Sequence, residues 1–161
     1  MNDDVTLREV SEEDLPVFFE NESDPEAVYM AAFTRKDPGD REAFLAHWRK
    51  ILVAPSVIAR TIVSHGEVVG SVMSYEDSGQ PEVTYWLGRN HWGQGIATRA
   101  LMMFLAEVDT RLPMRGRAAM DNAASLRVLE KCGFRVVGQA RGFANARGTE
   151  IEEMILELPQ R

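Results

Sequence analysis

Two glycines one residue apart, Gly93 and Gly95, lie in the stretch HWGQGIATRAL, directly before a run of apolar residues with helical spacing. Glycine is favoured where a chain turns tightly or where a ligand approaches the backbone. The amides of residues 92–97 and the free N–H groups of a first helical turn would form an anion site that suits a pyrophosphate. Taken alone, however, the glycines favour a tight strand-to-helix connection that binds nothing.

Two better-known phosphate-binding motifs do not fit this turn. A Walker loop needs a lysine and a hydroxyl residue after its second glycine, and Gln94-Gly95 follow Gly93 instead. A dinucleotide-binding fold needs a third glycine where Thr98 stands, inside a parallel βαβ unit. Asp121 could serve as the acid of such a fold, so the position of the acid does not exclude it. The stronger objection is that antiparallel hairpins, rather than βαβ units, are expected before the turn.

The elements that must position this turn follow an α/β order. Helices are predicted from Ser11, from Asp40, after Gly95 and from Asn122, whereas residues 26–33 form a short helix or an irregular segment. Extended runs are predicted at residues 5–10, 57–64, 67–75, 82–87, 114–120, 134–139 and 150–158, with short hairpin-like turns after the second and third. The order β-α-α-β-β-β-α-β-α-β-β predicts a single α/β domain over residues 1–161 with a mixed sheet.

The composition is that of a globular chain with an acidic balance. Hydrophobic residues make up 45% and charged residues 27%, and the formal net charge is −7. This balance argues against non-specific binding of nucleic acid or an anionic membrane, since both need a basic face, but it tolerates a cationic amine. The sequence shows no export signal or membrane-spanning run, and its single cysteine, Cys132, fits a reducing cytoplasm. No metal is expected, because the three histidines lack ligand-like spacing.

The stretches EVTYWLGRNHWGQGIATRAL and DNAASLRVLEKCGF together resemble the GNAT superfamily of acetyl-CoA-dependent N-acetyltransferases. They look most like the branch that acetylates the N-terminal alanine or serine of ribosomal proteins. The superfamily's cofactor motif, Gln/Arg-x-x-Gly-x-Gly/Ala, falls on Trp92-Gly93-Gln94-Gly95-Ile96-Ala97. The resemblance implies acetyl-CoA as co-substrate and a GNAT-like, mostly antiparallel sheet flanked by helices. Two neighbouring parallel strands of that sheet, 82–87 and 114–120, would splay apart.

The same resemblance places the co-substrate largely against main chain. Leu87 and Gly88 would end a bulged strand that pairs with the pantetheine arm, and Trp92 would provide packing. Asn122 would contact the pantetheine or thiol region, or would only cap its helix, and Arg127 and Lys131 would face the nucleotide end or solvent. The backbone amides implied to bind the pyrophosphate are those of Gly93, Gln94, Gly95, Ile96, Ala97 and Thr98.

Acetyl transfer to nitrogen requires a deprotonated amine, donors for the oxyanion and a sulfur that can leave. In relatives a carboxylate on the strand before the glycine turn often faces the acceptor, which makes Glu82 the candidate base; the alternative is a carboxylate at the rim. The backbone N–H near Leu87 would serve the oxyanion. The tyrosine of many members falls on Leu129, which cannot donate a proton. Ser125, one helical turn earlier, would hydrogen-bond the departing sulfur or only help to cap the helix.

The expected function is transfer of acetyl from acetyl-CoA directly to a primary amine, on a protein N-terminus or a small molecule, in a ternary complex. The alternative is a non-catalytic acetyl-CoA-binding or regulatory module, which Leu129 favours and Glu82 with Ser125 disfavours. By resemblance, residues 18–33 and the loop 141–149 would shape the acceptor pocket. Homodimers are common among relatives.

Overall fold

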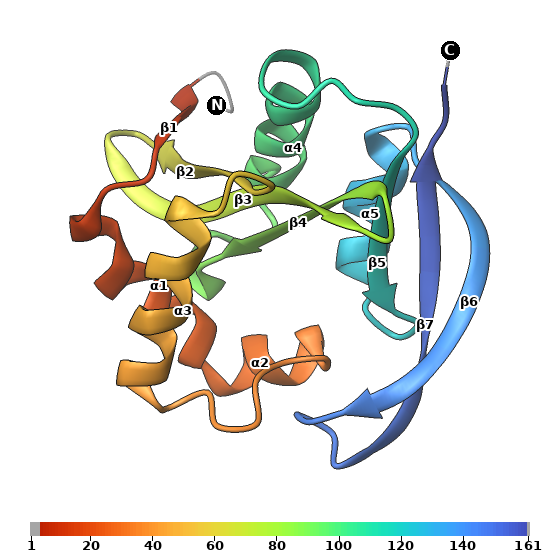
Figure 1. Cartoon of the computed structure of the whole chain (residues 1–161), viewed down its shortest axis with the longest axis horizontal. Coiled ribbons are helices and arrows are strands. Elements are labelled where there is room, and N and C mark those ends of the chain that lie inside the picture. The colour runs from red at the N-terminus through yellow and green to blue at the C-terminus, as the bar shows by residue number, and fades with distance from the viewer. Residues whose placement is uncertain (1–3, 161) are drawn as a thin grey trace.

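A seven-stranded sheet with the order β1-β2-β3-β4-β5-β7-β6 organises the computed structural model, which describes residues 4–160 (Figure 1). The ends of the expected domain, residues 1–3 and 161, lie outside the described residues. Neighbouring strands are antiparallel except for β4 and β5, so the expected mixed, mostly antiparallel sheet is confirmed. The strands are β1 (Val5–Glu9), β2 (Ile58–Ser64), β3 (Glu67–Asp77), β4 (Gln80–Leu87), β5 (Met114–Ala119), β6 (Arg135–Ala144) and β7 (Thr149–Leu158).

Between β1 and β2, the described chain forms three α-helices where the sequence predicted two with an uncertain segment. Asp24 ends the first helix and starts the next, because its carboxylate accepts a hydrogen bond from the Ala27 N–H and Pro25 occupies the first helical position. The helices are α1 (Leu15–Ser23), α2 (Pro25–Ala31), α3 (Arg41–Val53), α4 (Ile96–Glu107) and α5 (Ala123–Lys131), with short 3₁₀ turns at η2 (Glu12–Asp14) and η3 (Arg89–His91).

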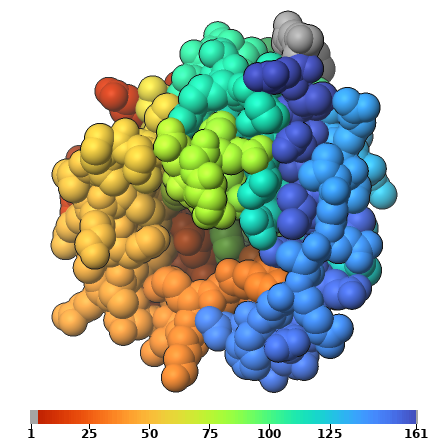
Figure 2. Space-filling model, turned by 45° about the vertical axis from the view of Figure 1, so that its right-hand side comes forward, coloured from red at the N-terminus to blue at the C-terminus, as the bar shows by residue number. Residues whose placement is uncertain are grey.

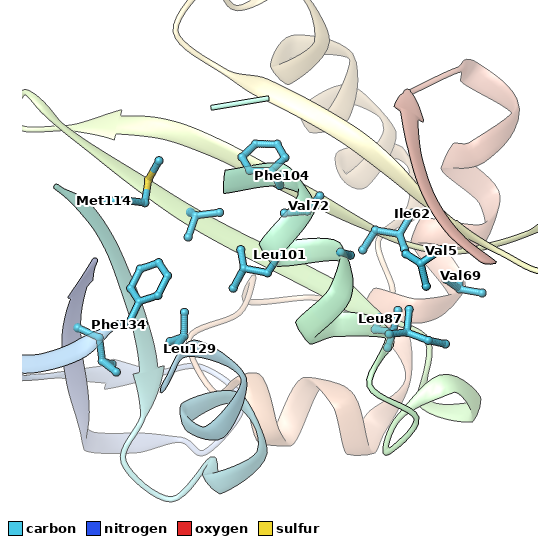
Figure 3. Packing of buried hydrophobic residues seen from close by; sticks show 14 residues of the cluster. Val5, Ile62, Val69, Val72, Leu87, Leu101, Phe104, Met114, Leu129 and Phe134 are labelled. Carbon is cyan, nitrogen blue, oxygen red and sulfur yellow. The ribbon is translucent and has the colours of Figure 1, made fainter. Parts of the chain in front are cut away.

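The helices cover both faces of the sheet. On one face α4 and α5 close the larger core, in which Leu101, Phe104 and Met114 are completely buried (Figure 3). On the other face α1 and α3 enclose a smaller core around Phe18 and Trp48, whose ring centroids lie 4.9 Å apart. The period of two in β4 therefore sends alternate side chains into two different environments.

Strands β4 and β5 diverge soon after they meet. Within residues 4–160, their single register pair is Glu82 with Arg115, while β5 pairs along its whole length with β7. This confirms the expected splay of the central strands. The prediction of a bulge in β4 was wrong, because β4 keeps continuous register with β3 from Gln80 to Leu87. The register shift in this part of the sheet lies in β2, between Ile62 and Val63. A side chain at Gly70 would collide with the Trp86 carbonyl, so the close contact of β3 and β4 there depends on glycine.

The last two strands are longer than predicted. β6 continues through Ala144, so most of the segment expected to form a loop at residues 141–149 is strand, and only a tight turn separates β6 from β7. Turn residues contact the chain that follows α2: the Asn145 side chain donates to the Thr34 carbonyl, and the Ala146 N–H donates to the Ala32 carbonyl. The β6–β7 turn is thereby attached to the segment after α2.

Asp14, at the third position of a capping box that starts at Ser11, also holds a buried cluster together. Its carboxylate accepts a hydrogen bond from the Ser11 N–H at 2.9 Å, from the Thr61 hydroxyl at 2.7 Å and from both terminal nitrogens of Arg8 at 2.8 Å. Burial alone would raise the pKa of Asp14, but these hydrogen bonds, led by that from Arg8, lower it to about 2.

We expect Asp14→Asn to lower the free energy of unfolding at pH 7 by about 1–2 kcal/mol, after allowance for solvent around the half-exposed Arg8. Because the folded pKa is depressed, this stabilisation is present above the unfolded pKa of about 4 and is lost as the pH falls through about 2. Urea unfolding at several pH values measures the difference. Glu13→Gln, which removes an exposed neighbouring carboxylate, is the control; a gap between wild type and Asp14→Asn that stays constant down to pH 3 would contradict the assignment.

Candidate functional site

The divergence of β4 and β5 leaves a cavity of about 730 Å³. Its walls come mainly from β4, β5, α2, the first turn of α4 and the length of α5, which are far apart in sequence. Figure 2 shows the hollow between α2 (orange), the turn joining β3 and β4 (yellow-green) and the strands β5 and β7 (teal and blue). The two sequence motifs, one before α4 and one in α5, therefore face a common space.

The cavity ends at the N-terminus of α4. Gly93 and Gly95 both adopt left-handed backbone conformations, with φ of 76° and 79°, which L-residues other than glycine rarely adopt. Asp24, Asp40 and Asn122 cap α2, α3 and α5, whereas in the described part of the chain no side chain caps α4 and its first turn carries no acid. The free amides of this turn therefore remain available to an anion. The Trp92 N–H, which was predicted to be one of the anion-binding amides, is not free, because it donates to the Arg89 carbonyl at 3.2 Å.

Most of the predicted cofactor-binding residues line the cavity, but two lie elsewhere. Gly88 is buried, and its N–H donates to the Val69 carbonyl at 2.9 Å. The Gln94 side chain donates to the Asn90 carbonyl at 3.3 Å. The predicted residues that line the cavity, together with two cations whose role was open, are Glu82, Leu87, Trp92, Gly93, Gly95, Ile96, Ala97, Thr98, Asn122, Ser125, Arg127 and Lys131.

Leu87 presents its backbone to the cavity rather than to β3. The Gly88 N–H donates to the Val69 carbonyl, so these two residues form a hydrogen-bonded pair between β4 and β3. In antiparallel strands, hydrogen-bonded pairs alternate with pairs whose N–H and C=O groups point away from the partner strand. The N–H and C=O of Leu87, the next residue, therefore point toward the β5 side. The Leu87 carbonyl accepts from the indole N–H of Trp92 at 3.0 Å. Trp92 remains 39% exposed, and this hydrogen bond holds its indole beside the end of β4. The Leu87 N–H is the group left facing the cavity.

Glu82 lies in the interior of the site and not at its rim, since only 6% of it is exposed. Its carboxylate accepts hydrogen bonds from the Tyr75 hydroxyl at 2.8 Å and from Nε of Arg117 at 3.2 Å. Arg117 also donates to Glu153 at 3.0 Å, and Asp77 lies 3.8 Å from its remaining nitrogen. Burial, followed by the charge of Glu82, raises the pKa of Tyr75, so its hydroxyl stays protonated as a donor.

Sequence reasoning missed these partners of Glu82. Tyr75 could have been identified from the sequence, because the short turn after Asp77 sets Tyr75 directly opposite Glu82 in the hairpin. Arg117 and Glu153 could not have been identified, because the three strands that carry Glu82, Arg117 and Glu153 come together only in the folded sheet.

Ser125 is held at the start of α5. Its N–H donates to Oδ1 of Asn122 at 3.2 Å, and the side-chain nitrogen of Asn122 donates to the Met30 carbonyl at 3.2 Å, which ties α5 to α2. The Tyr85 hydroxyl, from β4, lies 3.1 Å from the Ser125 oxygen. Leu129, at the position of the tyrosine found in many GNAT members, is buried in the core with 3% exposure.

Cys132 is packed between two helices. Its sulfur lies 3.7 Å from the Thr98 carbonyl, between α5 and α4, and burial raises its pKa to about 11. A thiol with this pKa is a poor nucleophile near neutral pH. Among residues 4–160, no group of three or more His, Cys, Asp or Glu side chains is placed to hold a metal ion. Across the same residues, no helix has the length and apolar character that crossing a membrane requires.

The aromatic residues in the two segments expected to shape the acceptor pocket, residues 18–33 and 141–149, separate into different environments. Phe33 and Met30 line the cavity. Phe18 is buried in the core between α1 and α3, and Phe143 is 60% exposed on β6. The Tyr29 ring lies under the Arg147 guanidinium, 3.9 Å from its centroid. The end of α2 therefore supplies the apolar wall of the cavity.

Comparison with known proteins agrees with this geometry. The chain is 26% identical to the uncharacterized N-acetyltransferase p20 of Bacillus licheniformis over 98% of this chain and 93% of that protein. Its fold is similar to Mycobacterium smegmatis RimJ in complex with CoA-disulfide (TM-score 0.79, 21% identity, 97% and 84% of the two chains). It is also similar to Vibrio cholerae spermidine N-acetyltransferase in complex with CoA and spermine (TM-score 0.79, 18% identity, 97% and 96%). The family model of the acetyltransferase (GNAT) domain matches residues 4–135, and the chain therefore belongs to this family.

Proposed function

We propose that this protein transfers an acetyl group from acetyl-CoA directly to a primary amine while both are bound. The observation that carries the proposal is the cavity between the splayed strands, which has the uncapped N-terminus of α4 at one end and the buried Glu82 carboxylate in its wall. Family membership and the similarity to an N-acetyltransferase from Bacillus licheniformis support it.

The residues of the cavity fit acetyl-CoA as a co-substrate. Free amides of the first turn of α4 would bind the pyrophosphate, and the glycines before it leave the backbone accessible. The β5-facing edge of β4 is open beyond Glu82, so it offers main-chain groups to the amides of a pantetheine arm. Arg127 and Lys131 lie in the same lining and would add positive charge for phosphates.

Three groups of this chain would then carry the chemistry. Glu82 would accept the amine proton, directly or through water, because only the free lone pair of nitrogen attacks a thioester. The Leu87 N–H would stabilise the charge that develops on the thioester oxygen. Ser125 would hydrogen-bond the sulfur as it leaves. Starting from the ammonium form, nitrogen loses two protons, the first of them to Glu82, and gains the acyl carbon. The carbon–sulfur bond breaks with its electron pair on sulfur, which takes up one proton, so one proton is released to the medium overall.

The charges around Glu82 favour a cationic acceptor. Arg117 is the cation in contact with Glu82, Glu153 and Asp77, so this group carries an excess of negative charge. A polyamine or a peptide N-terminus would be attracted, and a peptide of the ribosomal-protein type is one candidate among these. An acceptor with a carboxylate close to its amine would be disfavoured.

Release of free thiol from acetyl-CoA, measured with a panel of amines, tests the proposal. The panel should contain a polyamine, peptides that begin with alanine or serine, and the same peptides with blocked N-termini as matched controls. We expect thiol release with cationic primary amines, and acetylated products by mass spectrometry. Tight CoA binding with no release for any amine would instead support a non-catalytic module, and absence of CoA binding would refute both functions.

A further inference from the structure

We propose that Tyr85 is a positioning residue for the reaction: it donates a hydrogen bond to Ser125 and so orients the serine hydroxyl toward the leaving sulfur. The inference rests on the proposed function, because it needs a thioester in the cavity. Leu129 occupies the position of the tyrosine found in many family members and has no hydroxyl. The inference assigns a role to the hydroxyl of a β4 residue instead.

The first observation is the geometry of the pair. The Tyr85 hydroxyl lies 3.1 Å from the Ser125 oxygen, and both residues line the cavity. They come from different elements, β4 and α5, and are separated by 40 residues in the chain. In the part of the chain that the structure describes, Tyr85 is the one protein partner of the Ser125 hydroxyl, so when Tyr85 donates, the serine hydrogen is free for a ligand.

The second observation is that both partners are held in place. The Ser125 backbone is fixed by its N–H bond to Asn122, which is itself bonded to Met30. Tyr85 lies on the face of β4 that packs against the core formed with α4 and α5. A hydroxyl whose position is fixed can stabilise a developing charge without reorganising during the reaction.

The direction of the hydrogen bond follows from the chemistry of the two groups. Two hydroxyls can donate either way, but a sulfur that gains negative charge attracts the serine hydrogen and leaves the serine oxygen to accept from tyrosine. Burial raises the pKa of Tyr85 to about 12, partly offset by its hydrogen bond with Ser125, so Tyr85 remains a protonated donor throughout the usual assay range. Tyr85 thus does not become the final proton source: sulfur takes its proton from the medium, and the Tyr85–Ser125 pair ends the reaction unchanged.

A double-mutant cycle tests the inference. Tyr85→Phe keeps the ring and removes only the hydroxyl, and Ser125→Ala removes its acceptor. We expect each to lower kcat roughly tenfold, the loss of a hydrogen bond to a charged group, with the KM for acetyl-CoA within about twofold of wild type. The double variant should be no slower than Ser125→Ala, because Tyr85 acts through Ser125. Ser125→Thr, which keeps a hydroxyl, should recover part of the rate and restore the sensitivity to Tyr85→Phe.

The possible failures separate the inference from the proposed function. The role of Tyr85 would be overturned if Tyr85→Phe kept the wild-type kcat while Ser125→Ala was slow. It would also be overturned if the double variant lost kcat by the product of the two single losses. Either result would leave acetyl transfer intact. Wild-type kcat in Ser125→Ala would overturn it together with the serine assignment. A wild-type protein that releases no thiol with any amine would overturn both the inference and the proposed function. Melting temperatures within a few degrees of wild type would show that the variants are folded.

Discussion

Gly93→Trp is expected to abolish measurable binding of coenzyme A, a loss of roughly 100-fold or more in affinity, while the protein remains folded. Gly93 lines the cavity beside the uncapped first turn of α4, where an indole would occupy the space of the pyrophosphate and cover the amides. In the wild type, saturation at about 100 times Kd should raise the stability by about 2.7 kcal/mol, which a thermal shift detects readily. In Gly93→Trp this shift should disappear.

Gly66→Trp is the matched control for this experiment. Gly66 has the same φ of 76° as Gly93, and at both positions an added Cβ would meet no atom within 4 Å. The strain of placing a non-glycine residue there, about 1–2 kcal/mol, is therefore common to both variants. Gly66 lies in the hairpin between β2 and β3, away from the residues that line the cavity. If Gly93→Trp binds coenzyme A as tightly as Gly66→Trp, the pyrophosphate site is not at α4.

Local rules were sufficient for the part of the site that depends on backbone conformation. The sequence predicted a tight glycine turn before α4 and the cap of α5 by Asn122, because glycine spacing and helix-capping residues act over a few positions. The alternation of side chains along a strand also accounts for the position of Glu82 and Tyr85 on opposite faces of β4. Family resemblance, rather than any local pattern, supplied the splay of β4 and β5.

The remainder of the site depends on contacts between distant segments. Nothing local to Arg117 shows that it meets both Glu82 and Glu153, and nothing local to Tyr85 shows that α5 brings Ser125 opposite it. Trp92 was expected to provide packing, and nothing local to it showed that the turn of η3 would also bring its indole N–H to the Leu87 carbonyl. Side-chain partners of this kind are fixed by strand order and helix placement, which no single motif encodes.

Glu82→Gln is expected to lower kcat by about 10² to 10³, because a general base contributes on this order and an amide cannot accept the amine proton. Glutamine has nearly the same shape and can still accept from the Tyr75 hydroxyl, so the fold and the affinity for coenzyme A should change little. The deficit should shrink as the pH rises past about 8, where a peptide N-terminus loses its proton to solvent without help. Steady-state rates of thiol release between pH 6 and 10 measure this dependence.

Glu153→Gln separates loss of a base from loss of an ion pair. Glu153 and Glu82 contact the same guanidinium, with Arg117 donating to each carboxylate, so both substitutions weaken the hold on Arg117. Only Glu82→Gln removes the proposed proton acceptor. Glu153→Gln should therefore raise the KM of a cationic acceptor, through the lost negative charge, and leave kcat within a few-fold of wild type. Equal losses of kcat in the two variants, or a deficit in Glu82→Gln that does not vary with pH, would show that Glu82 acts by positioning Arg117 and that another group or water accepts the proton.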